Sequence, residues 1–111
     1  MISWKSGERR IAKILGCERI PVTGRRRKDA PSDLVSGWLA VECKTTKRMP
    51  RYLANAMNQA EAGAAHFERK DSKPRLAIAV IHEDSSEYLN SVVCLRLRDF
   101  VEFFGGDEAV A

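Results

Sequence analysis

The feature that most constrains the fold is an uninterrupted apolar run from Leu76 to Ile81 in a chain of 111 residues. Such a run is expected of a central strand that is covered on both faces, because a strand with one wet face alternates apolar and polar residues. Helices are predicted before and after it in the sequence, which gives an α/β fold. A chain of this length supports one hydrophobic core, so residues 1–111 are predicted to form a single domain.

Local periodicity predicts the other elements. A helix is expected from about Ser3 to Leu15, with Ser3 as its N-cap and Gly16 as its stop. A long helix from about Arg51 to Arg69 follows Pro50. The remaining predicted elements are the strands Ile20–Val22, Ser32–Val35, Trp38–Thr45 and Tyr88–Leu97, and a short helix through Phe104 that Asp99 caps. The order α-β-β-β-α-β-β-α predicts a mixed central β-sheet flanked by helices.

The bulk properties exclude several classes of protein. No apolar run approaches the roughly 20 residues of a membrane helix, and the N-terminus lacks the apolar core of a signal peptide. We therefore expect a cytoplasmic protein with no membrane partner. Cys17, Cys43 and Cys94 lie far apart without zinc-site spacing, so they are expected to be reduced and mostly buried.

Positive charge is concentrated in the first half of the chain. Residues 1–50 hold 12 Lys/Arg and 5 Asp/Glu, whereas residues 51–111 hold 7 and 10. A basic half indicates a phosphate-rich partner, although a charge run alone usually marks a solvated face. The candidate phosphate contacts are Arg25, Arg26, Arg27, Lys28, Lys47, Arg48 and Arg51.

Three carboxylates and one lysine converge in the predicted fold. Glu8 shares a helical stripe with apolar residues, which places a carboxylate in line with the core. Asp33 begins one strand of a hairpin, and Glu42 and Lys44 share one face of its partner strand. A two-residue turn at Ser36-Gly37 would set Asp33 opposite Leu39 or Ala40, within a residue or two of Glu42.

Such a cluster predicts a metal site. Three carboxylates beside one lysine would repel one another unless a divalent cation neutralised them. Hard oxygen ligands favour Mg²⁺, with Mn²⁺ as a substitute, and both serve phosphodiester hydrolysis. Lys44, partly desolvated, would orient the attacking water or offset charge on the phosphate. The alternative is an exposed ion pair between Glu42 and Lys44, with Glu8 on the surface and Asp33 only capping a turn.

These residues resemble a known family. Pro31-Ser32-Asp33 followed by Glu42-Cys43-Lys44 resembles the signature of the PD-(D/E)XK nucleases, although Ser32 separates the proline and aspartate that the family has adjacent. With Glu8 on the preceding helix and Gln59 on the following one, the order is similar to that of archaeal and phage Holliday junction resolvases. The resemblance covers roughly residues 5 to 98.

The resemblance implies a restriction-endonuclease-like core that holds one or two Mg²⁺ ions. It implies a homodimer that nicks four-way DNA junctions symmetrically in a bacterial, archaeal or phage-infected cell. The implied metal ligands are Asp33, Glu42 and the backbone carbonyl of Cys43, with Glu8. Thr23 or Ser32 would supply a hydroxyl near the site, and Gln59 would contact DNA. Phe100, Phe103 and Phe104 are candidates for the dimer interface.

Two other functions remain open on the sequence. One is a restriction-like or nicking nuclease that acts on other branched or duplex DNA. The other is a catalytically silent DNA-binding module of the same fold. A chain of 111 residues leaves little surface for a sequence-reading domain, which favours recognition of DNA shape by a dimer.

Overall fold

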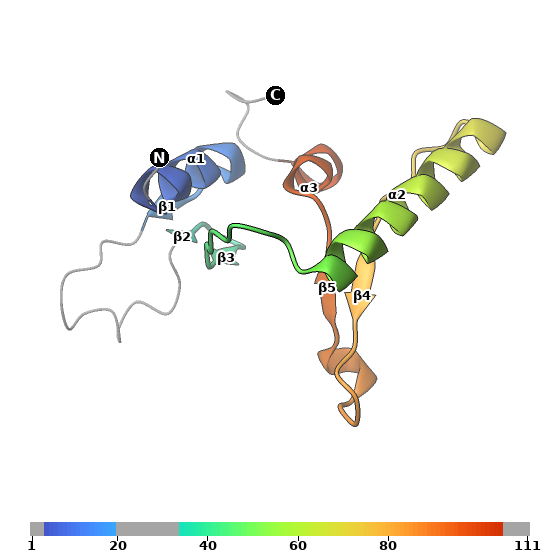
Figure 1. The fold of residues 1–111 in the computed structure, drawn as a ribbon. Helices are drawn as coiled ribbons and strands as arrows, with labels where there is room; N and C mark the ends of the chain where they lie inside the picture. Colours follow the sequence, from blue (N-terminus) through green and yellow to red (C-terminus); the bar gives the residue numbers. More distant parts are fainter. Residues whose placement is uncertain (1–3, 20–33, 106–111) are drawn as a thin grey trace. The chain divides into compact units, whose positions relative to one another are not determined.

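The computed structural model describes residues 4–19 and 34–105 (Figure 1). Its helices and short strands follow the predicted order, so the overall class is mixed α/β. Two compact units divide the chain, residues 1–47 with 104–111 and residues 48–103. Among the described helices, none has the length and apolar character needed to cross a membrane.

Helix α1 opens the first unit and spans Trp4–Leu15. It ends where the sequence predicts, at Gly16, whose φ of 68° suits a residue without a side chain. The amide of Cys17 donates to the carbonyl of Ala12 at 2.8 Å and closes the last turn. The predicted N-cap, Ser3, lies outside the described residues.

Three short strands form an antiparallel sheet in the first unit. They are β1 (Glu18–Arg19), β2 (Leu34–Val35) and β3 (Ala40–Val41), in the order β1-β2-β3. Helix α1 contacts β1. The strand predicted at Ile20–Val22 lies outside the described residues, and β1 precedes it.

The β2–β3 connection is longer than predicted. Val35 pairs with Ala40, so the loop contains the four residues 36–39 rather than Ser36-Gly37 alone. The Ser36 amide donates to the Leu39 carbonyl at 2.9 Å, and the Leu39 amide donates to Ser36 Oγ at 3.3 Å. Ser36 thus faces Leu39 in the same register, and the turn is centred on Gly37 and Trp38, one residue later than predicted. Trp38, predicted to begin the strand Trp38–Thr45, lies instead in this loop and is 64% exposed.

Helix α2 (Arg51–Asp71) and a two-stranded antiparallel sheet form the second unit. Strands β4 (Ala79–Ile81) and β5 (Val92–Cys94) pair with Val80 opposite Val93. The 3₁₀ helix η2 (Tyr88–Asn90) and helix α3 (Leu97–Phe104) flank β5, where one strand was predicted from Tyr88 to Leu97. Asp99 lies in the first turn of α3 and is not its cap.

The apolar run from Leu76 to Ile81 is covered on one face rather than two. Ala77 and Ala79 are buried, together with Met57 of α2, and α2 contacts β4. The alternate residues Ile78 and Val80 are 40% and 57% exposed. Successive side chains on a strand point to opposite faces, so buried and exposed residues alternate along the run although all of them are apolar. All pairings between described strands are antiparallel, in two sheets instead of one mixed sheet.

Polar contacts fix the C-terminal end of α2. Ser72 is left-handed with φ 60°, and its amide donates to the Glu68 carbonyl at 2.8 Å. The Arg75 guanidinium binds both carboxylate oxygens of Asp71, and the Arg75 amide donates to Glu68 Oε1 at 2.7 Å. The hydrogen bonds that Asp71 accepts from the Arg75 guanidinium and from the Lys73 amide lower the pKa of Asp71. The helix end is thus held by ionic contacts as well as by its backbone.

Asp71→Asn tests this helix end. The pKa of Asp71 is lower in the folded chain than in the unfolded chain, where it is roughly 4. Its ion pair with Arg75 therefore stabilises the fold above that pH, and this contribution is lost as the pH falls through the folded-state pKa. We expect circular dichroism to show a lower melting temperature for the variant than for the wild type at about pH 7, and a smaller difference at about pH 2. Asp84→Asn, in an exposed turn, is the control. An equal deficit at both pH values would contradict the assignment.

Candidate active site

The carboxylate of Glu8 is buried within the first unit. Glu8 lies in the second turn of α1, is 5% exposed, and its Oε2 has essentially no contact with solvent. The helical stripe therefore predicts its burial correctly, and the alternative of a surface glutamate is wrong. A buried carboxylate is uncommon in proteins and is retained where a partner or a metal compensates its charge.

The helix that carries Glu8 approaches the segment after β3. A Cβ atom placed on Gly7 would lie 3.9 Å from the side-chain oxygen of Thr45. Thr45 follows Lys44 directly in the sequence. The residue next to Glu8 therefore lies close to the residue next to Lys44, with room at Gly7 for a methyl group but for little more.

Glu42 and Lys44 form an ion pair at the surface. Lys44 Nζ lies 3.5 Å from Glu42 Oε2, and their side chains are 78% and 46% exposed respectively. The predicted desolvation of Lys44 is therefore wrong. Strand β3 ends at Val41, so both residues lie in the segment beyond the sheet. Their spacing of two places both on one side of an extended chain, as the sequence predicts.

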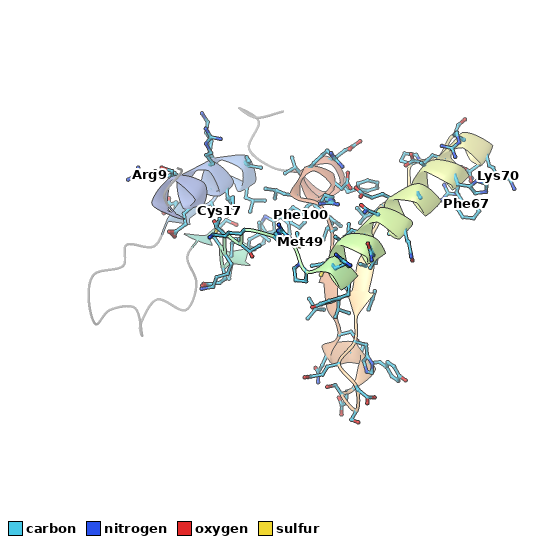
Figure 2. The ribbon with its side chains drawn as sticks, in the orientation of Figure 1. Arg9, Cys17, Met49, Phe67, Lys70 and Phe100 are labelled. Atoms are coloured by element: carbon cyan, nitrogen blue, oxygen red, sulfur yellow. The ribbon has the colours of Figure 1, made fainter. Side chains whose placement is uncertain are left out.

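The first unit also holds basic residues that were not predicted as site residues. Arg9, Arg10 and Lys13 of α1 are exposed, and Figure 2 shows Arg9 pointing outward from the helix. The sequence indicates them by their position, because they are basic residues of α1 that do not belong to its apolar stripe. Gly7 and Thr45 were also missed, because neither residue type indicates a contact by itself.

Several predicted site residues lie outside the described part of the chain. In the sequence, Asp33 directly precedes Leu34 and Glu42 directly follows Val41, and Leu34 and Val41 are partners in the β2–β3 register. Among the described residues, no group of three or more His, Cys, Asp or Glu could hold a metal ion. The predicted site residues outside the described ranges are Asp33, Thr23, Arg25, Arg26, Arg27, Lys28 and Ser32.

The remaining predicted residues divide between the two units. Lys47 belongs to the first unit with Glu8, Glu42 and Lys44, and it is exposed. Arg48, Arg51 and Gln59 are exposed and belong to the second unit. Cys17, Cys43 and Cys94 are free thiols that are half-buried, rather than mostly buried as expected.

Comparison with protein-family models, with curated proteins and with solved structures gives no significant match to this chain.

Substitution of Gly7 tests the contact between α1 and Thr45. At 3.9 Å a Cβ fits at ordinary van der Waals distance, so Gly7→Ala should raise the free energy of unfolding by up to about 1 kcal/mol through helix propensity. Gly7→Leu should lose that gain, because its longer side chain must displace Thr45. Urea unfolding measures both variants.

Gly63 of α2 provides the matched control, because a Cβ there meets no atom within 4 Å. Gly63→Ala and Gly63→Leu should both stabilise the chain, since the two residues have similar helix propensities. If Gly7→Leu is as stable as Gly7→Ala, the approach of Thr45 to α1 is not close enough to matter.

Proposed function

We propose that the chain is a Mg²⁺-dependent DNA endonuclease with Glu8, Asp33, Glu42 and Lys44 as its catalytic set. One observation carries the proposal. The helix with the buried carboxylate of Glu8 lies close, at Gly7 and Thr45, to the segment that holds Glu42 and Lys44. A purely structural helix–strand contact has no need of a buried carboxylate at this point, because an apolar side chain fills such a position at lower cost.

The donor set fits a hard divalent cation. Asp33 and Glu42 adjoin the same register pair in the sequence, and together with the Cys43 carbonyl and Glu8 they offer only oxygen ligands. We propose Asp33, Glu42 and the Cys43 carbonyl as the ligands that hold Mg²⁺, with Glu8 completing the set. When bound, the ion supplies positive charge to the scissile phosphate and lowers the pKa of water.

Lys44 would act on the substrate once its partner is engaged elsewhere. In the structure its ammonium pairs with Glu42 in an exposed position. An exposed ion pair of this kind contributes little stability, so it is easily exchanged. When Glu42 serves as a metal ligand, Lys44 can turn to the phosphate and offset the negative charge that develops there.

The finer assignment is a Holliday junction resolvase with a restriction-endonuclease-like core, acting in the cytoplasm. The sequence resemblance supports it, through Asp33, Glu42 and Lys44 with Glu8 on the preceding helix and Gln59 on the following one. The exposed pair of Glu42 and Lys44 favours a second candidate, a catalytically silent DNA-binding module in which the pair is only a solvated contact. Cleavage assays separate the two.

Removal of a proposed metal ligand tests the chemistry. Wild-type protein should cut labelled DNA in Mg²⁺ or Mn²⁺ and not in EDTA. Asp33→Asn, Glu42→Gln and Glu8→Gln should each lower the rate by roughly two orders of magnitude or more, since even residues that only support metal ligands are worth about 10–100-fold. Binding to DNA should survive, because each change removes negative charge near phosphate.

Glu102→Gln is the matched control, since Glu102 is an exposed carboxylate on α3 far from the set in the sequence. It should cleave at the wild-type rate. Near wild-type cleavage by Glu42→Gln would refute the metal-site assignment. DNA binding without any cleavage by the wild type would favour the silent module.

A resolvase must also place two active sites symmetrically. A twofold homodimer does so, because an isologous interface repeats one site across the axis. Phe103 and Phe104, 42% and 54% exposed on α3, are the proposed interface residues with Phe100. Sedimentation should therefore give twice the chain mass of 12.5 kDa, and excess linear duplex should compete poorly for four-way junctions. A monomer that cuts duplex as fast as junctions would contradict the resolvase assignment alone.

A further inference from the structure

The solvent-facing side of α2 has an unusual composition. We define the outer face of α2 as the exposed residues that recur at spacings of three and four along the helix, which place them on one side. None of them is acidic. They are Arg51, Asn55, Asn58, Gln59, Ala62, His66 and Arg69, with Tyr52 and Lys70 at the edges.

All three acidic residues of α2 interact with arginines on other segments of the second unit. Glu61 pairs with Arg96 at 3.3 Å and with Arg98 at 3.4 Å. Glu68 accepts a hydrogen bond from the Arg75 backbone amide, and Asp71 pairs with the Arg75 side chain. The negative charge of the helix is therefore compensated away from its outer face.

The cations of the outer face are not compensated in the same way. Within the described part of the chain, no ion pair engages Arg51, Arg69 or Lys70. Figure 2 shows Lys70 near the end of α2, beyond Phe67. Arg51 lies in the first turn, where the helix dipole disfavours a cation. The dipole does favour Arg69 and Lys70, which lie in the last turn, so Arg51 is the cation of this face that helix stability does not explain.

A merely solvated helix face has a different pattern. Such faces usually mix both signs of charge and gain stability from Glu–Lys pairs at a spacing of four. The outer face of α2 has cations near both ends and neutral hydrogen-bonding side chains between them. Side-chain amides can donate and accept at once, as the edges of DNA bases require.

We propose that the outer face of α2 binds in a groove of duplex DNA, with Arg51 and Arg69 on phosphates and the amides of Asn55, Asn58 and Gln59 toward base edges. The inference rests on the proposed function for its ligand, because DNA is the substrate there. Arg51 and Arg69 lie 18 residues apart, which is about 27 Å of helix. The major groove is about 12 Å wide and admits an α-helix.

Charge removal at the two ends is the first test. Binding of a labelled duplex is measured by fluorescence anisotropy in EDTA, over a range of salt concentrations, so that no cleavage occurs. Arg51→Gln with Arg69→Gln should lower the slope of log affinity against log salt by about 1.8, since each lost phosphate contact contributes about 0.9. Lys73→Gln removes one charge from an exposed residue beyond the helix and should leave the slope unchanged.

Isosteric charge introduction is the second test. Asn58→Asp with Gln59→Glu keeps the shape of the side chains and places two negative charges on the outer face. The double variant should weaken duplex binding at least tenfold at fixed salt, through about 1.4 kcal/mol of lost affinity. Asn90→Asp, on exposed η2, is the matched control and should bind as the wild type does. Circular dichroism verifies that each variant keeps its helix content.

The outcomes separate this inference from the proposed function. If the α2 variants bind as the wild type does while Glu42→Gln still abolishes cleavage, the nuclease stands and the outer face is only solvated. If the α2 variants lose binding but the wild type cuts no DNA, the inference stands and the nuclease falls. If polyglutamate displaces DNA with the same dependence on Arg51 and Arg69, the face binds any polyanion and the DNA inference is overturned.

Discussion

Two hydrogen bonds between Ser36 and Leu39 close the loop that joins β2 to β3, and the register of the first sheet follows from this loop. That register sets Leu34 opposite Val41. Because side chains alternate along a strand, a shift by one residue would exchange the two faces of β3 and of the segment that continues it. Glu42 and Lys44 share a side because they are two residues apart, but which side of the sheet that is depends on a loop to which neither belongs.

The elements that the sequence predicts well are those with a local physical cause. Gly16 ends α1 because it adopts a positive φ, and Pro50 precedes α2 because a proline suits the start of a helix. The burial of Glu8 is also predictable, since the spacing of apolar residues in α1 defines the inward side. These features need no knowledge of distant contacts.

The predictions that are wrong needed information from beyond the local segment. Ser36-Gly37 is compatible with a two-residue turn, but the hydrogen bonds between Ser36 and Leu39 place the turn one residue later, at Gly37 and Trp38. The exposure of Lys44 depends on where β3 ends and on what covers the chain beyond it. Likewise Ile78 and Val80 are as apolar as buried residues, and only the one-sided contact with α2 leaves them exposed. The contact of Gly7 with Thr45 has no signature in either segment alone.

The short hairpin of the second unit has a consequence for self-association. Strands β4 and β5 each pair with one other described strand, and Val80 and Val93 lie opposite each other while more than half exposed. An apolar strand with an unpaired edge can template the addition of a strand from another molecule. Each strand has only three residues, so an added strand would gain few backbone hydrogen bonds. Short strands therefore limit how strongly this edge can bind a strand from another molecule, and any change that lengthened β4 would raise that limit.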